Sequence, residues 1–537
     1  MPTVHDEVET KYEAEAGFEV PSLVELFGAV RGKAGVPASD GAPWAEGELA
    51  EQHLDATYYD TAALDLAAAG LTLRRRVGGD DAGWHLKVPV ADSSRSEIRV
   101  PLQDEQNTVP DQLVTMTYAR TGGRTLVAVA RIATDRTVRR LVDPTGRVLV
   151  EVADDRVTAH RLLPSGDPAE AISWREVEVE LVDGPRELLT AVDPVLRERG
   201  LTPAPTSSKL VRALGAETVE AARKSAGGTG PATVGGKGRK LPKKVSAGDV
   251  AMAHIGAQVS QIRAQDLPVR LDLPGAVHAM RVASRRLRSA LTTFEPLFHG
   301  TVTRPAGREL RWLAGVLGVA RDAEVMRDRL TAAVVGEGDD TRLSAGVDQE
   351  VSDRLDESYR AAHDQVLVQL DGERYRVLLA TLEALLEHPP FKDRASRPAR
   401  NALPGLVTRS YAALRWSMVA ANGSSDPVEH ENLLHDARKA AKRARYAGEA
   451  VAPVFGDDAR AFAAAMERVQ ESLGEHLESM NTRNRLHDLA AQTSEPSTAF
   501  TLGRLHALEE VRAERSAAEV DAAWAAASKK RLRRWLH

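Results

Sequence analysis

The sequence contains no cysteine, and this absence removes several classes of chemistry. Without thiols the chain cannot carry disulfide bridges, thiolate zinc sites or cysteine nucleophiles. It has no run of about 18 or more apolar residues, so no membrane span is expected. Its first residues include acids where a signal peptide would have a basic segment before an apolar run. We therefore expect a cytoplasmic protein.

The composition is that of a large folded chain. Hydrophobic residues make up 43% of the 537 residues and charged residues 28%, with a formal net charge of only -6. A chain of this length is expected to form two or three domains. The small net charge conceals a local sorting of acids and bases, which the motifs below reveal.

The first part of the chain shows the period-two alternation of β-strands. The segments are EVETK, ATYYDT, LTLRRRV, WHLKVPV, SEIRVPL, RTLVAVARIATDR, GRVLVEVADDRV and WREVEVELV. Helical patterns interrupt them near residues 20–32 and 185–199. So many alternating strands favour a closed or nearly closed antiparallel barrel.

A change of composition separates this part from the rest. Residues 224–244 are rich in Gly and Lys and lack periodic apolar positions, which is typical of a flexible basic linker. Beyond residue 246 the apolar spacing is three and four, which predicts an all-α bundle. We place the boundaries at 1–216 for the strand domain, 217–245 for the linker and 246–537 for the helical domain.

Charged side chains share one face of several predicted strands, because alternate residues of a strand point to the same side. The groups are Glu7, Glu9 and Lys11; Arg74 and Arg76; Lys87; Arg95, Glu97 and Arg99; and Glu176, Glu178 and Glu180. One interpretation is an ordinary sheet with a solvated face. The sign of the charge, however, differs from strand to strand. A barrel with these faces inside would hold carboxylates suited to a divalent cation beside Arg and Lys suited to phosphate.

These residues give the first part of the chain its resemblance to the CYTH, or triphosphate tunnel metalloenzyme, family. The family's ExExK motif stands here as Glu7, Glu9 and Lys11. It is followed in the family's order by YYDT, LRRR, LK, RSE, Arg131, VADD, EVEVEL and SK, over about residues 3–215. The resemblance implies an eight-stranded antiparallel tunnel that binds a triphosphate chain, with Mg²⁺ or Mn²⁺ held by glutamates.

The resemblance also implies roles for individual residues. It assigns phosphate binding and catalysis to Lys11, Arg74, Arg76, Lys87, Arg131 and Lys209. It assigns metal binding to Glu7, Glu9, Glu176, Glu178 and Asp154. In VADDRV the family's aspartate is either Asp154 or Asp155, and the position of Glu180 along its strand leaves its role open.

The helical part contains an internal repeat. VHAMRVASRRLR and LHDARKAAKRAR align with His278 and His435 157 residues apart, and a second pair of segments starts at Leu317 and Leu473, 156 residues apart. In each first segment, basic residues at offsets of 0, 3, 7 and 10 fall on one helix face. Such a stripe can be a solvated face. Two stripes at matched positions instead indicate a polyanion site.

This part resembles the CHAD (conserved histidine α-helical domain) family through H-x-x-R-V-x-x-R-R-L-R and LG-x-x-R-D-x-E, over about residues 245–537. The resemblance implies two four-helix bundles and binding of inorganic polyphosphate. It assigns that binding to His278, Arg281, Arg285, Arg286, Arg288, Arg321, His435, Arg438, Lys439, Lys442, Arg443 and Arg445. Leu477 and Glu478 depart from the pattern, so unequal halves are expected.

The sequence thus predicts a multi-domain protein. An α+β domain with a closed antiparallel barrel of eight strands precedes an all-α domain of duplicated four-helix bundles. The expected activity is metal-dependent hydrolysis of inorganic triphosphate, with polyphosphate and its granules as partners. The alternatives are a non-catalytic polyphosphate-binding protein and an adenylate cyclase. Nucleic acid is not the expected ligand, because aromatics that could stack on bases are scarce in the stripes.

Overall fold

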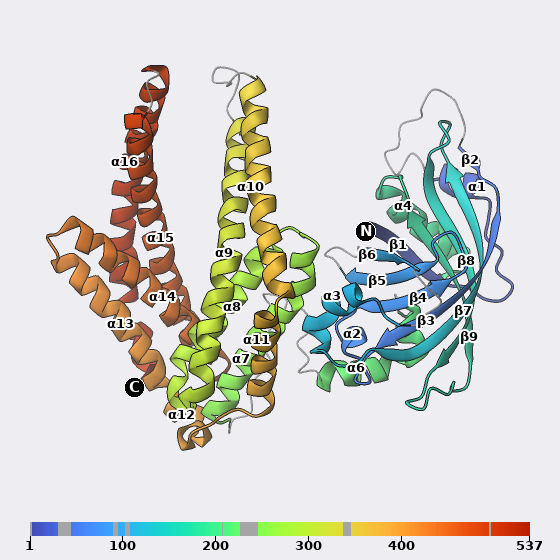
Figure 1. The fold of residues 1–537 in the computed structure, drawn as a ribbon, viewed down its shortest axis with the longest axis horizontal. Helices are drawn as coiled ribbons and strands as arrows, with labels where there is room; N and C mark the ends of the chain where they lie inside the picture. Colours follow the sequence, from blue (N-terminus) through green and yellow to red (C-terminus); the bar gives the residue numbers. More distant parts are fainter. Residues whose placement is uncertain are drawn as a thin grey trace. The chain divides into compact units, whose positions relative to one another are not determined.

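The computed structural model describes residues 3–30, 44–89, 95–102, 108–206, 208–225, 245–336, 345–492 and 496–536. The chain divides into two compact units, residues 1–231 and 232–537 (Figure 1). Among the described residues, no helix combines the length and the apolar character needed to cross a membrane.

The first unit is built on an antiparallel sheet. Its strands are β1 (Thr3–Glu13), β2 (Ala45–Glu46), β3 (Ala50–Asp60), β4 (Thr72–Val77), β5 (Gly83–Pro89), β6 (Arg95–Pro101), β7 (Val127–Val142), β8 (Val148–Arg161), β9 (Ile172–Leu181) and β10 (Thr202–Pro203). The order is β10-β1-β6-β5-β4-β3-β7-β8-β9, with β2 beside β7. Every strand predicted from the alternation is present.

The pairing of β1 gives the sheet its curvature. Its first half, Thr3 to Glu7, pairs with β6, and its second half, Val8 to Glu13, pairs with β9. The predicted antiparallel sheet is therefore confirmed, whereas the predicted number of eight strands is not, because the sheet has ten strands. The two additional strands, β2 and β10, are two residues long, too short for an alternating pattern to reveal.

Short helices complete this unit. They are α1 (Leu23–Gly28), α2 (Asp65–Ala68), α3 (Asp111–Thr121), α4 (Glu187–Glu198), α5 (Lys209–Leu214) and α6 (Ala216–Ser225). Phe27 of α1 and Val192 of α4 are buried against Val177 and Val179, which lie on the outer face of β9. Burial of this outer face leaves the alternate residues of the same strands to line the interior.

Helix α5 fills one end of the interior. Leu210 and Ala213 belong to the same buried cluster as Ile132 of β7 and Ala159 of β8. Val219 of α6 joins that cluster and is only 3% exposed. Residues 216–225 therefore form a packed helix, and the prediction of a linker starting at 217 was wrong for this segment. The pattern of α6 is too short and polar to have been recognised as a helix.

The second unit is entirely helical. Its helices are α7 (Ala247–Arg270), α8 (Ala276–Thr293), α9 (Gly300–Gly336), α10 (Ala345–Asp371), α11 (Glu373–Glu387), α12 (Ala399–Ala402), α13 (Pro404–Gly423), α14 (Pro427–Phe455), α15 (Asp457–Gln492) and α16 (Pro496–Ala527). Helices α7 to α10 pack on their chain neighbours, and so do α13 to α16. The predicted helical domain is confirmed.

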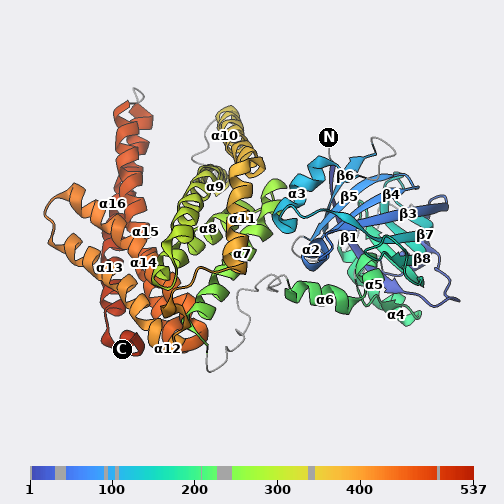
Figure 2. The same cartoon turned by 60° about the horizontal axis from the view of Figure 1, so that its bottom comes forward.

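The two sets of four helices meet where α8 and α14 lie side by side (Figure 2). Their internal similarity extends to side-chain packing. The guanidinium of Arg281 on α8 lies against Gly318 of α9, and that of Arg438 on α14 lies against Gly474 of α15. Equivalent arginines thus rest on equivalent glycines, which lack the Cβ that would displace them.

Candidate functional site

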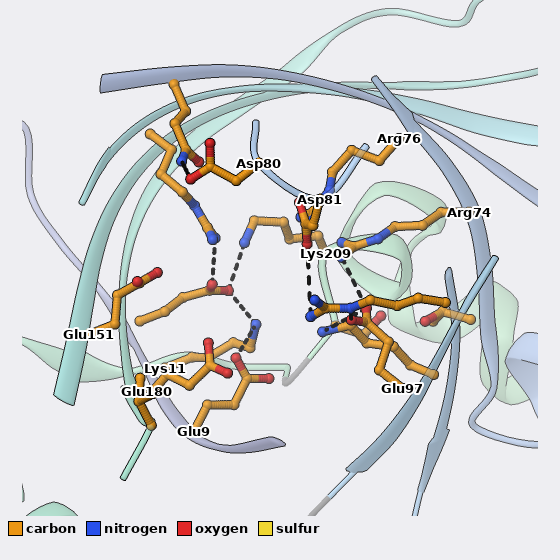
Figure 3. Close-up of a pocket in the computed structure, with 18 of the residues that line it drawn as sticks. Glu9, Lys11, Arg74, Arg76, Asp80, Asp81, Glu97, Glu151, Glu180 and Lys209 are labelled. Atoms are coloured by element: carbon orange, nitrogen blue, oxygen red, sulfur yellow. Dashed lines mark hydrogen bonds and ion pairs between the residues drawn. The ribbon is translucent and has the colours of Figure 1, made fainter. Parts of the chain in front are cut away.

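The interior of the curved sheet holds a charged pocket of about 300 Å³ (Figure 3). Its basic lining residues are Lys11, Arg74, Arg76, Lys87, Arg99, Arg136, Arg140 and Lys209. Its acidic lining residues are Glu9, Asp80, Asp81, Glu97, Glu151, Glu178 and Glu180. The pocket, referred to below as the interior pocket, is therefore a mixed site in which both signs of charge lie close together.

Glu97 organises the basic side of the interior pocket. Its fully buried carboxylate lies 2.6 Å from Nε of Arg99, 3.0 Å from Nδ1 of His85, 3.3 Å from Nη2 of Arg74 and 3.6 Å from Nζ of Lys87. Burial acts to raise the pKa of Glu97, but the hydrogen bond from His85 and the charges of Lys87 and Arg74 outweigh it and lower that pKa strongly. One carboxylate therefore anchors several cations.

A second carboxylate supports the neighbouring cations. Asp81 forms an ion pair with Arg76 and lies 3.8 Å from Nη2 of Arg99. Burial and the charge of Arg74 lower the pKa of Arg76 to about 9, which leaves it charged at neutral pH. Burial also lowers the pKa of His85 to about 4. His85 is thus a buried support for Glu97, whereas Arg76 adds a charge to the pocket.

On the opposite strands, three buried carboxylates surround the ammonium of Lys209. Its Nζ atom is 2.7 Å from both Glu176 and Glu178 and 2.9 Å from Asp155. Arg136 makes two further contacts, at 2.7 Å to Asp155 and 2.6 Å to Glu178. Burial acts to raise the pKa of Glu178, but the neighbouring cations, Lys11 and Lys209 foremost, lower it well below its usual value. This cluster already contains its own counter-charges.

A row of carboxylates crosses three adjacent strands at the acidic side of the pocket. Glu9 of β1 is the direct cross-strand neighbour of Glu180 of β9, which in turn is the neighbour of Glu151 of β8. All three line the pocket (Figure 3). Lys11 lies 3.1 Å from Glu9, and Arg140 lies 2.9 Å from Glu151. Like charges directly opposite each other destabilise a sheet, so this row favours an additional cation.

Most residues predicted for the first unit come together in this way. Lys11, Arg74, Arg76, Lys87, Lys209, Glu9 and Glu178 line the interior pocket. Glu176 contacts Lys209, which lines the pocket. The backbone of Glu7 pairs with that of Arg95, but the side chain of Glu7 lies outside the described part of the structure.

Two predictions for this site were wrong. The side chain of Arg131 is 63% exposed and forms an ion pair with Asp55 on the outer side of the sheet. Asp154 pairs at 2.8 Å with Arg175, and it is the adjacent Asp155 that reaches the interior. Both errors have the same cause, since side chains one residue apart on a strand face opposite sides.

Sequence reasoning missed Arg136, Arg140 and Glu151 as lining residues. The signal for them was present in the register. The residue numbers of Arg136 and Arg140 differ by an even number, so their side chains lie on the same face of β7. Both numbers differ from that of Arg131 by an odd number, so Arg131 lies on the opposite face. Once β7 is aligned with β8, Arg136 opposes Asp155 and Arg140 opposes Glu151. That alignment is set by tertiary pairing, which the alternation within one strand does not specify.

In the second unit, five of the predicted basic residues line a cleft of about 490 Å³ between α8, α9 and α14. The basic residues that line this basic cleft are Arg285, Arg288, Arg304, Arg308, Arg311, Lys439, Lys442 and Arg443. Burial and the charges of Arg285 and Arg438 lower the pKa of Lys442 to about 7. Arg304, Arg308 and Arg311 of α9 were not predicted, since they lie outside the repeated motifs.

The other residues predicted for polyphosphate binding do not line this cleft; most contact other protein groups. Arg286 and Arg445 share Glu449, at 3.3 Å and 2.7 Å. Arg281 pairs with Asp322 and Arg321 pairs with Glu324, whereas Nε2 of His435 lies 3.9 Å from Glu431. His278 is exposed. The two stripes are thus not equivalent in their surroundings.

Comparison with known proteins identifies both units. Residues 33–213 match the CYTH domain and residues 253–487 match the CHAD domain. The uncharacterized protein MT2285 of Mycobacterium tuberculosis (strain CDC 1551 / Oshkosh) is 33% identical over 539 residues, covering 97% of this chain and 96% of the relative.

Two solved structures are also similar. PptA from Streptomyces chartreusis is 22% identical, with a TM-score of 0.42, and covers 52% of this chain and 99% of its own. The CHAD domain from the plant Ricinus communis is 25% identical, with a TM-score of 0.43, and covers 56% of this chain and 97% of its own.

Proposed function

The chain belongs to the proteins that join a CYTH domain to a CHAD domain, and we propose that it is a metal-dependent inorganic triphosphatase that also binds polyphosphate. The observation that carries the proposal is the interior pocket, in which eight basic and seven acidic side chains line one space of about 300 Å³. That volume is at the lower end of the range for small-ligand sites, about 300–1,000 Å³.

The basic side of the pocket suits a linear chain of phosphates. The single carboxylate of Glu97 pairs with Arg74, Lys87 and Arg99, so these three cations lie close together in the pocket, where they suit the oxygens of a phosphate chain. In the proposed reaction, water attacks the terminal phosphorus and the bond to the bridging oxygen breaks, which yields orthophosphate and diphosphate. Prepositioned cations stabilise the charge that moves to the leaving oxygen.

The lining favours an inorganic substrate over a nucleotide. Of the described residues that line the pocket, only Tyr58 and Val182 are aromatic or apolar. Ligand sites for organic molecules are lined mainly by apolar and aromatic groups. An adenine or thiamine ring would find little such surface here, so triphosphate is the substrate that the chemistry of the pocket supports best.

The acidic row fits a divalent cation. Glu9, Glu180 and Glu151 offer oxygen ligands, the type that Mg²⁺ prefers, and their like charges are adjacent across the sheet. When bound there, Mg²⁺ or Mn²⁺ would polarise phosphate oxygens and orient water. The buried cluster around Lys209 fits less well, because Lys11, Arg136 and Lys209 already neutralise its three carboxylates.

Phosphate release from triphosphate, with and without Mg²⁺ or Mn²⁺, tests the enzyme. Arg74→Gln and Glu180→Gln are expected to reduce kcat/KM by at least about 100-fold, within the range found when single electrostatic donors are removed. Arg131→Gln is the matched control, because Arg131 is exposed on the outer side of the sheet. Equal loss in all three variants, or no release by the wild type, would contradict the proposal.

For the second unit, we propose binding of long polyphosphate chains at those basic residues of α8 and α14 that line the basic cleft, Arg285 and Lys442 among them. Their guanidinium and ammonium groups grip phosphate without reading sequence. Because the two units are covalently joined, a chain held by the helical unit would raise the concentration of phosphate ends near the interior pocket. Localisation at cytoplasmic polyphosphate granules follows from the same affinity. Loss of granule association in Arg285→Glu with Lys442→Glu tests it.

A further inference from the structure

Arg288 and Arg445 occupy equivalent positions in the two repeats but have different partners. Nε of Arg445 is 2.7 Å from Glu449, and its Nη2 is 2.7 Å from Glu467. Arg288 has no carboxylate within ion-pairing distance in the part of the chain that the structure describes. The repeat therefore carries one neutralised and one uncompensated arginine.

The sequence explains this difference. By the offset of 156 that aligns Leu317 with Leu473, the counterpart of Glu467 is Arg311. By the offset of 157 that aligns the two histidines, the counterpart of Glu449 is Thr292. Both acids that neutralise Arg445 are thus absent from the first repeat. Arg311 and Thr292 instead line the basic cleft.

The basic cleft concentrates positive charge. Eight basic residues and one acid line it, and that acid, Glu295, pairs at 2.7 Å with Arg304. Burial, followed by the charges of Arg311, Arg285 and Arg443, lowers the pKa of Arg288. Like charges held together in this way repel one another, so a polyanion that enters the cleft relieves an unfavourable interaction as well as forming new ones.

We propose that the helical unit binds its phosphate chain asymmetrically, in the basic cleft between α8, α9 and α14, with Arg288, Arg308 and Arg311 as principal contacts. Arg286 and Arg445 stabilise the joint between the repeats instead. Both share Glu449 and flank the ring of Tyr446, with guanidinium carbons 5.3 Å and 5.7 Å from its centroid. The inference rests on the proposed polyphosphate binding and assigns to it residues of α9.

Fluorescence anisotropy with labelled long-chain polyphosphate and the full chain, without divalent cations so that hydrolysis is suppressed, tests the asymmetry. Arg311→Gln is expected to weaken binding about 5- to 10-fold and to reduce the slope of log affinity against log salt concentration by about 1, as for the loss of one phosphate contact. Arg445→Gln, the matched control, should change affinity less than twofold.

If Arg445→Gln folds poorly, a second variant, Glu467→Gln, still tests the asymmetry. Glu467→Gln releases Arg445 from one partner and should tighten binding about 2- to 5-fold, the equivalent of one exposed ion pair. Equal losses in Arg311→Gln and Arg445→Gln would overturn the asymmetry while leaving polyphosphate binding intact. Failure of the wild type to bind would overturn the proposed function itself. Displacement of polyphosphate by an equal concentration of single-stranded DNA would overturn the assigned ligand.

Discussion

The Nζ atom of Lys209 lies 2.7 Å from Oε1 of Glu178, and the same ammonium also contacts Glu176 and Asp155. Lys209 is the first residue of α5, whose apolar residues are buried at one end of the sheet interior. The packing of α5 therefore places a cation where three carboxylates converge. Burial acts to lower the pKa of Lys209, but Asp155, Glu178 and Glu176 raise it well above its usual value.

Removal of this ammonium should destabilise the first unit strongly. Lys209→Met keeps the apolar stem but leaves buried carboxylates with less compensation, and breaking a buried pair in this way costs about 3–5 kcal/mol. Urea unfolding at neutral pH measures the loss. Lys224→Met is the control, because Lys224 is 75% exposed and its ion pair with Glu220 spans 3.9 Å. Similar stability of the two variants would show that the cluster is not a structural element.

Replacement of Glu97 should give a stability loss that depends on pH. The folded-state pKa of Glu97 lies well below the unfolded value of about 4.3, so its contribution is full above that pH and is lost progressively as the pH falls from there toward the folded-state pKa. Glu97→Gln is therefore expected to be destabilised by about 3 kcal/mol at pH 7. The difference in free energy of unfolding between Glu97→Gln and the wild type should narrow below about pH 4.

Chemical unfolding of both proteins across this pH range measures that gap. A difference that stays constant down to low pH would show that Glu97 contributes by packing and not by charge. Glu151→Gln is a useful comparison, since Glu151 is 22% exposed and pairs only with a partly exposed arginine in the described structure. The free energy of unfolding should fall less in Glu151→Gln than in Glu97→Gln at every pH, because exposed pairs are worth about 0–1 kcal/mol.

Alternation within a strand was sufficient to predict which residues share a face, and this placed Lys11, Arg74 and Glu178 in one pocket. It did not reveal which residue of one strand stands opposite which residue of the next. Arg131 was chosen from its place in the family's order of motifs, whereas the register with β8 turns Arg136 inward against Asp155. Register is fixed by hydrophobic packing and turn geometry across the whole sheet, so a single strand cannot specify it.

The helical unit shows a similar limit. Helical periodicity predicted the stripes that contain Arg285 and Lys442, and both line the basic cleft. The partners that neutralise Arg445 lie one turn along its own helix and on α15. Which neighbouring helix faces a stripe depends on packing, and for this reason Arg311 was not foreseen.

Glycine positions beneath the stripes provide a separate test of polyphosphate binding. A Cβ at Gly474 would lie 3.0 Å from Nη2 of Arg438, close enough to displace the guanidinium. Gly474→Ala should therefore weaken polyphosphate binding about 2- to 5-fold, comparable to the loss of one exposed ion pair. It should also stabilise the helix by up to about 1 kcal/mol.

The control for this substitution is Gly315→Ala on α9, where a Cβ would have no neighbour within 4 Å. It should give the same helix stabilisation with unchanged affinity. Thermal unfolding and polyphosphate titration of both variants separate the two effects. Unchanged affinity in Gly474→Ala would show that the position of Arg438 does not contribute to binding.

The pKa of Lys442 predicts opposite effects of pH on stability and on polyphosphate affinity. The folded value is about 7, whereas an unfolded lysine titrates near 10.4. Between these values the unfolded chain binds more protons, so stability from this site rises with pH. A bound polyanion favours the charged ammonium and raises its pKa, so affinity should fall as the pH increases above about 7. Lys442→Arg remains charged throughout, so neither its stability nor its polyphosphate affinity should show this dependence on pH. A wild-type affinity that does not change from pH 7 to 9 would contradict a contact between Lys442 and phosphate.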